Sequence, residues 1–180
     1  MSRMPHLVLL SCLLVLATAV SAPCQEPTPF EDPAGGKWGY RDPATHRVLI
    51  PPRFICAEKF NAHGRALAAT KEGWALIDRQ GNALLRPFIF DNWPDEFSDG
   101  LARFIQDGKI GYFNPKGEVV VPARYDFGEP FSNGLAAVCL GCVTVKDGEH
   151  SRSVGGQWGC IDRSGRIVRP VTSPVPECSR

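Results

Sequence analysis

Short runs of alternating apolar and polar residues recur along this chain of 180 residues. The clearest run starts at Trp158, passes through a small residue, and reaches a turn at Gly165. A second run, rich in β-branched residues, follows the turn and ends at Pro170. Because alternate side chains of a strand share a face and proline cannot donate to a ladder, the pattern predicts two short strands joined by a turn.

This pattern occurs four times, each time beginning at a bulky anchor residue. The anchors, at spacings of 36, 36 and 48 residues, are Trp38, Trp74, Ile110 and Trp158. A fixed period in this range is typical of repeat arrays. The residue two positions after each anchor is predicted to share the anchor's face. The Gly or Ala between them faces the other way, where a missing side chain admits a neighbouring backbone.

Between the repeats, two near-identical segments, Phe97 to Ala102 and Phe131 to Ala136, lead into a further strand, and Phe60 to Ala66 matches them more weakly. Such short connections favour antiparallel pairing. We therefore predict an all-β fold, an array of short antiparallel β-meander repeats with three full units and a C-terminal half-unit. An open twisted array and a propeller-like packing are both consistent with the pattern.

The ends of the chain differ from the repeats. Residues 1–22 are predicted to be a signal peptide, because Arg3 precedes an apolar run that ends in small residues. Residues 23–36 form an extended, Pro/Gly-rich leader, residues 37–170 the repeat domain with an insertion at 139–156, and residues 171–180 a tail. No membrane span is expected after cleavage, so a periplasmic or extracellular location follows. A lipoprotein-type cleavage before Cys12 is disfavoured by the short apolar run preceding it.

The repeated segments carry a family resemblance. They are Lys37 to Tyr40, Gly73 to Asp78, Lys109 to Tyr112, Gln157 to Asp162 and the two Phe-Ser-x-Gly-Leu-Ala segments. As a set they resemble the WG (KWG) repeat family over residues 37–170. Two units depart from the family pattern, with Ala75 in place of Gly and Ile110 in place of Trp. The anchor position therefore requires a bulky apolar side chain more than an indole ring. The resemblance implies a repeat-built β architecture, often in exported bacterial proteins, and no single activity.

Charge and motifs point away from several functions. The formal net charge is +1, which gives no electrostatic footprint for nucleic acid. His46, His63 and His150 lie in different units without a partner for a catalytic triad, so neither an enzyme nor a cofactor is expected. The favoured function is an exported, non-catalytic module that binds a protein, a peptide or a cell-envelope glycan. A purely structural envelope protein is the alternative.

One loop and one residue stand apart from the repeats. Trp93 lies outside the repeated pattern, so among the aromatic residues it is the strongest candidate for exposure and for a contact role, and partial burial against Pro94 is the alternative. The acids around it form either a solvated loop or a weak calcium site. They are Asp91, Asp95, Glu96 and Asp99.

Cysteine usage agrees with export. Removing the signal peptide and Cys12 leaves six cysteines, and an even number in an exported chain favours disulfides. We predict a Cys139–Cys142 bridge that pins the insertion and a Cys24–Cys178 bridge that joins the ends of the chain. Cys56 and Cys160 then either pair or stay buried thiols. The alternatives are a redox-active Cys139–Cys142 motif, or a metal site made by Cys139, Cys142, His150 and Cys160.

Overall fold

The computed structural model describes residues 25–148, 150–172 and 178, and strands are its only regular elements there. The first meander contains β1 (Thr28–Asp32), β2 (Lys37–Arg41) and β3 (Val48–Phe54). The second contains β5 (Ala66–Thr70), β6 (Gly73–Ile77) and β7 (Ala83–Pro87). The third contains β10 (Ala102–Gln106), β11 (Lys109–Phe113) and β12 (Val119–Tyr125). The fourth contains β14 (Leu135–Asp147), β15 (His150–Asp162) and β16 (Ile167–Thr172).

Four two-residue strands lie in the connections between meanders. They are β4 (Cys56–Ala57), β8 (Ile89–Phe90), β9 (Trp93–Pro94) and β13 (Phe127–Gly128). β4 pairs with β5 and β13 pairs with β14, so each extends the meander that follows it. β8 and β9 instead pair with each other as a small separate hairpin.

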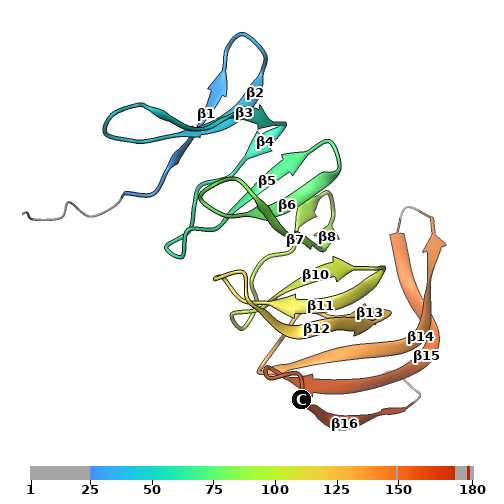
Figure 1. Ribbon diagram of the computed structural model, residues 1–180. Coiled ribbons are helices and arrows are strands. Elements are labelled where there is room, and N and C mark those ends of the chain that lie inside the picture. Colours follow the sequence, from blue (N-terminus) through green and yellow to red (C-terminus); the bar gives the residue numbers. More distant parts are fainter. Residues whose placement is uncertain (1–24, 149, 173–177, 179–180) are drawn as a thin grey trace, which may run out of the picture.

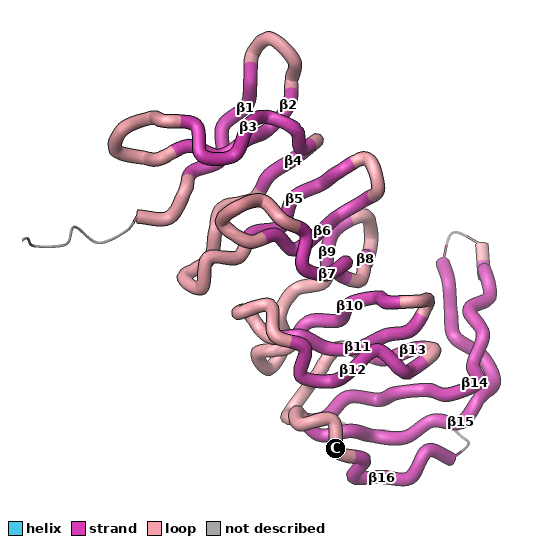
Figure 2. The backbone as a smooth tube through the Cα atoms, in the orientation of Figure 1, coloured by secondary structure: helices cyan, strands magenta, loops and turns pink. Residues whose placement is uncertain are grey.

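The meanders follow one another in an open, elongated array (Figures 1 and 2). All strand pairs are antiparallel, and β7 pairs with β10, so the second and third meanders share one seven-stranded sheet. The first and fourth meanders form sheets of three and four strands. The all-β array predicted from the repeats is therefore confirmed, and it is open rather than closed on itself.

The segment predicted as a leader contributes to the first sheet. β1 pairs with β2 over its whole length, from Thr28 opposite Arg41 to Asp32 opposite Lys37. Each meander thus begins one strand before its anchor residue. Counted in this phase, the array has four complete meanders, and the predicted domain boundary at residue 37 falls inside the first of them.

The predicted insertion is not a loop but the outer part of a long hairpin. β14 and β15 are thirteen residues each and pair from Leu135 opposite Asp162 to Asp147 opposite His150. Figure 1 shows this hairpin bending away from the fourth meander and rising beside the array. Gly155 and Gly156, at φ of 68° and 70°, lie at the bend, in a backbone conformation that glycine adopts readily.

The turns after the last three anchors share one hydrogen-bonding pattern. In the turn after each of the last three anchors, an Asp or Asn side-chain oxygen accepts hydrogen bonds from the backbone N–H groups two and four residues later, at 2.8–3.1 Å. A glycine near φ of +80° completes each turn. The three pairs are Asp78 with Gly81, Asn114 with Gly117 and Asp162 with Gly165.

The small residue after the anchor allows a close backbone approach. A Cβ atom placed on Gly39 would lie 2.6 Å from the Ile50 carbonyl oxygen, and one on Gly111 would lie 2.6 Å from that of Val121. The strand register shifts at both places, which brings the neighbouring strand close. The predicted role of these glycines is confirmed.

Candidate functional site

Each pair of successive meanders meets at a junction. The residue two positions after the anchor faces the next meander and determines how closely the two meanders pack there. Tyr40 and Tyr112 are fully buried in the first and third meanders. Their rings pack edge-on against Phe60 and Phe131, with centroids 4.7 and 4.8 Å apart. Each hydroxyl donates a 2.8 Å hydrogen bond to a backbone carbonyl of the following connection, that of Glu58 or Glu129.

Both phenols remain protonated donors over a wide pH range. Burial raises the pKa of Tyr40 and of Tyr112 above the ordinary tyrosine value, because the phenolate would lose its hydration. The neutral hydroxyl can therefore hold the connecting loop at any pH at which the protein is normally folded.

The second meander carries Leu76 at this position. Leu76 pairs with Leu85 as Tyr40 pairs with Ile50 and Tyr112 with Val121, so the register is the same. Leu76 is buried against Ala102, Phe104 and Phe113, but it reaches less far than a tyrosine ring.

Phe97, in the connection after the second meander, is packed differently from its counterpart Phe131. Phe97 precedes the Ser-x-Gly-Leu-Ala sequence as Phe131 does, yet it is 41% exposed whereas Phe131 is buried. Its ring packs edge-on against Phe113, at 5.3 Å between centroids. The space that a tyrosine and a phenylalanine fill at the neighbouring junctions is left open here.

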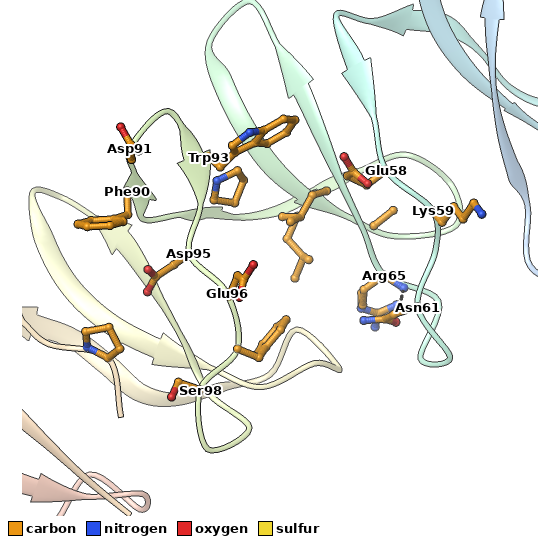
Figure 3. A pocket seen from close by; sticks show the side chains of 16 residues that line it. Glu58, Lys59, Asn61, Arg65, Phe90, Asp91, Trp93, Asp95, Glu96 and Ser98 are labelled. Carbon is orange, nitrogen blue, oxygen red and sulfur yellow. Dashed lines mark hydrogen bonds between the residues drawn. The ribbon is translucent and has the colours of Figure 1, made fainter. Parts of the chain in front are cut away.

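The result is a cleft of about 810 Å³ between the second and third meanders (Figure 3). This volume lies within the range of roughly 300–1,000 Å³ that is usual for ligand-binding pockets. Leu67 and Leu76 supply aliphatic surface, and the connections before and after the second meander supply the polar walls. The polar and aromatic residues that line it include Glu58, Asn61, Arg65, Phe90, Trp93, Glu96, Phe97 and Ser98.

The β8–β9 hairpin presents two aromatic side chains at this cleft. Asp91 and Asn92, at φ of 49° and 72°, form its two-residue turn, a conformation that both side chains tolerate. Phe90 is 69% exposed and Trp93 is 54% exposed. Trp93 leans on the anchor Trp74, with ring centroids 4.8 Å apart. Trp93 is thus exposed, as one of the two alternatives drawn from the sequence has it, and it is among the residues that line the cleft.

A buried ion pair fixes the loop behind this hairpin. Arg103 on β10 is only 3% exposed, and its guanidinium binds both carboxylate oxygens of Asp95, at 2.7 and 2.8 Å. A third hydrogen bond, 2.8 Å long, runs to the carbonyl of Gly128, and the guanidinium lies 4.2 Å from the ring centre of Phe88. The charge of Arg103 is thus satisfied on every side, and the loop is held by it.

The acids near Trp93 do not converge as the calcium alternative requires. Asp95 is engaged by Arg103, and Asp99 accepts a 2.7 Å hydrogen bond from the backbone N–H of Gly134. Over the part of the chain that the structure describes, no three His, Cys, Asp or Glu residues are grouped for a metal ion. Glu96 faces the cleft instead (Figure 3).

The cysteines pair differently from the predicted scheme. Cys139 is joined to Cys142, with Cα atoms 6.1 Å apart, as predicted. Cys178, however, is bonded to Cys160 and not to Cys24, which lies outside the described residues. Local spacing indicated the first bridge, whereas the second joins cysteines 18 positions apart in the sequence. Cys56 is a free thiol.

This pairing also bears on the metal and redox alternatives. Cys139, Cys142 and Cys160 are bonded within disulfides, so they offer no thiolate to a zinc ion in this state, and the side chain of His150 lies outside what the structure describes. Cys139 is fully buried and Cys142 nearly so, which shields their bridge from an exchanging thiol. With Trp158 and Cys178 they form the apolar cluster that covers the outer face of the last meander.

The other anchors serve the packing between repeats. Trp38 packs on the first core cluster and Ile110 lies in the core between the third and fourth meanders. The indole N–H of Trp158 donates a 3.0 Å hydrogen bond to the Gly155 carbonyl, which satisfies it inside the hairpin bend. Trp74, half-buried like Trp38, packs on Trp93 and so supports a residue that lines the cleft.

Comparison with known proteins agrees with the repeat pattern. A family model described as "WG containing repeat" matches residues 74–109 and 110–141, which hold most of the second and third meanders. No curated protein and no solved structure matches the chain. The described residues include no helix that is long and apolar enough to cross a membrane.

Proposed function

This chain is a WG repeat-containing protein, and we propose that it is an exported, non-catalytic module that binds an extended protein segment in the cleft between its second and third meanders. The observation that carries the proposal is the contrast between junctions. The junction that follows the second meander is open because that meander carries Leu76, whereas Tyr40 and Tyr112 close the junctions that follow the first and third meanders. Exposed aromatic side chains lie at the open junction.

The surface of the cleft suits a protein ligand. Phe90 and Trp93 are large, rigid and exposed, and tryptophan is prominent among the residues that dominate binding energy at protein interfaces. Leu67 and Leu76 add an apolar floor against which a side chain can lose its water. A monomeric protein gains nothing from leaving such aromatic groups in solvent.

Export is supported by two features of the chain. Residues 1–22 have the composition of a signal peptide, although they lie outside the described residues. Two disulfides, Cys139–Cys142 and Cys160–Cys178, fit an oxidising compartment. An envelope protein is therefore the expected class of partner.

Site-specific photo-cross-linking tests this function. A benzophenone amino acid placed at Phe97 is expected to capture one protein partner in intact cells, whereas the same group at the exposed Val48 of the first meander captures none. The capture should be lost when Leu76→Tyr fills the cleft and kept with Leu76→Met. Identical adducts from positions 97 and 48, or a glycan adduct in place of a protein, would rule out the proposal.

A further inference from the structure

We infer that the segment bound in this cleft carries an arginine, whose guanidinium lies against Trp93 between the carboxylates of Glu58 and Glu96. This inference rests on the proposed function and adds the chemistry of the partner to it. It follows from the charges left in the cleft and from the way in which the neighbouring junctions are closed.

Two carboxylates are available in the cleft. Figure 3 shows Glu58 and Glu96 on opposite walls, with Trp93 above the space between them. Among the described residues neither carboxylate has an ion-pair partner, whereas Asp95 next to Glu96 is bound by Arg103. The end of the cleft near Trp93 is therefore negative.

Two cationic residues line the cleft, Lys59 and Arg65, and both lie away from Trp93 (Figure 3). Arg65 lies beside Asn61, at the end of the cleft away from Trp93 (Figure 3). Its Nε donates a 2.8 Å hydrogen bond to the carbonyl of Lys116, and one terminal nitrogen donates a 2.9 Å bond to that of Gly64. The bond to the Lys116 carbonyl ties Arg65 to the turn of the third meander, and among the described residues neither Arg65 nor Lys59 forms an ion pair with Glu58 or Glu96.

The other two junctions contain an arginine of their own. Arg53 lies over Phe54, 5.2 Å from its ring centre, and donates a 2.7 Å hydrogen bond to the carbonyl of Gly81 in the next meander. Arg124 lies over Tyr125, at 5.0 Å, and donates a 3.1 Å bond to the carbonyl of Gly165. In both junctions the guanidinium joins an aromatic face to an oxygen acceptor across the boundary.

The middle junction has no arginine at the corresponding place. Phe88 follows Leu85 by three residues, as Arg53 follows Ile50 and Arg124 follows Val121. This junction is also the one that leaves an aromatic face and two carboxylates exposed. Arg65 already donates to a turn carbonyl of the next meander here, that of Lys116, so a partner's arginine would supply only the aromatic stacking that Arg53 and Arg124 provide at the other junctions.

Arginine fits this cleft better than other side chains. Its planar guanidinium stacks on an indole and can donate to two carboxylates at the same time. Lysine offers a point charge without the flat face, and a neutral side chain leaves both carboxylates unpaired. The aliphatic floor around Leu76 receives the methylene groups of the arginine stem.

Binding of defined peptides to the purified mature protein tests the inference. The probe is a fluorescein-labelled, amidated heptapeptide, Gly-Ser-Pro-Arg-Pro-Ser-Gly, and its match carries citrulline, the uncharged analogue, in place of arginine. We expect fluorescence anisotropy to show at least tenfold weaker binding of the citrulline peptide, in line with the strength of charge-assisted hydrogen bonds. Binding of the arginine peptide should weaken as ionic strength rises from about 0.01 M to about 0.15 M.

Matched variants locate the contact. Glu58→Gln and Glu96→Gln keep the shape of each side chain and are each expected to weaken the arginine peptide severalfold, while leaving the citrulline peptide unchanged. Glu31→Gln, on β1 and outside the cleft, removes the same charge and serves as the control. Trp93→Leu should weaken the arginine peptide as well, because the aromatic face is lost.

Failure of this inference is distinguishable from failure of the proposed function. If both peptides bind equally, or if Glu31→Gln acts like Glu58→Gln, the arginine contact is wrong. If neither peptide binds while position 97 still captures a protein partner, the cleft binds protein but not through arginine. If position 97 captures nothing and no peptide binds, both proposals fall.

Discussion

The junction between the third and fourth meanders is closed, and the junction between the second and third is open. Their strand pairing differs as well: β13 pairs with β14 at the closed junction, whereas β7 pairs with β10 at the open one and β8 and β9 form a hairpin of their own. Tyr112 fills the closed junction with its buried ring, and its hydroxyl donates a hydrogen bond to the connection that follows. Leu76 leaves the open junction with a cleft of about 810 Å³. The repeated meander thus builds the array, and a change of core side chain together with a change of strand pairing between meanders leaves room for a ligand at one junction.

An open junction needs another means of holding its loops. At the closed junctions the tyrosine hydroxyl binds the following connection directly. At the open one, Arg103 reaches back to Asp95 and stacks on Phe88, so the loop is fixed from behind and the cleft stays accessible. The two junctions are therefore stabilised by different interactions, which the following experiments separate.

The largest effect is expected from the ion pair behind the cleft. Arg103→Met leaves the carboxylate of Asp95 buried without a partner, and breaking such a pair typically costs about 3–5 kcal/mol of unfolding free energy. Urea denaturation measures this loss. Arg79→Met breaks a more exposed pair with Glu26, and we expect a loss of no more than about 1 kcal/mol there.

Removing both partners sharpens the same test. The double variant Arg103→Met/Asp95→Leu removes the orphaned charge, so it should be more stable than Arg103→Met alone. Equal stability of the single and the double variant would show that Asp95 is not held as the structure indicates.

The second effect comes from opening a closed junction. Tyr112→Leu reproduces the side chain of the second meander in the third, and it removes a buried ring and its hydrogen bond. Large-to-small core changes of this kind cost about 2–4 kcal/mol when the surroundings cannot collapse. Thermal and urea unfolding should both report the loss. A cost near zero would mean that Phe131 moves into the gap, as Phe97 has moved toward Phe113.

Much of this architecture could be predicted from the sequence, because it depends on local chemistry. The Asx turns at Asp78, Asn114 and Asp162 join residues at most four positions apart. The shared face of each anchor with the residue two positions later follows from strand geometry alone. Both features were recognisable without knowing how the meanders stack.

The parts that were missed depend on distant partners. β1, Thr28–Asp32, has a proline and no apolar alternation, so only its pairing with β2 reveals it as a strand. The Cys160–Cys178 bridge joins residues 18 positions apart, a distance at which sequence spacing indicates no pairing. Leu76 occupies the position that Tyr40 and Tyr112 hold in their units, but Glu58 and Arg65 come from the preceding connection, and only the stacking of meanders brings them to the same cleft.

Closing the open junction is the converse experiment. Leu76→Tyr places the ring of the first and third meanders in the cleft, and because the space is already open we expect the unfolding free energy to change by less than about 1.5 kcal/mol. Binding of the arginine peptide should nevertheless fall at least tenfold. Leu76→Met conserves volume and should keep binding. A tyrosine variant that still binds would place the ligand site outside the cleft.

The smallest effect concerns the tyrosine hydroxyl alone. Tyr112→Phe keeps the ring and removes the hydrogen bond to the Glu129 carbonyl, a loss of about 1 kcal/mol for a typical buried bond. The pH dependence of this difference identifies its origin. Burial raises the pKa of Tyr112 in the folded protein, whereas the unfolded chain has the ordinary value of about 10.

The sign of that dependence follows from proton linkage. Below pH of about 10 the tyrosine is protonated in both states, so its contribution is fully present. Above that pH the unfolded chain releases the phenolic proton first, and the wild-type protein loses stability that the phenylalanine variant keeps. Urea titrations between pH of about 8 and about 11 should therefore show the advantage of the wild type shrinking and then reversing. Parallel stability curves over this range would mean that Tyr112 is open to solvent, and the contrast between closed and open junctions would lose its basis.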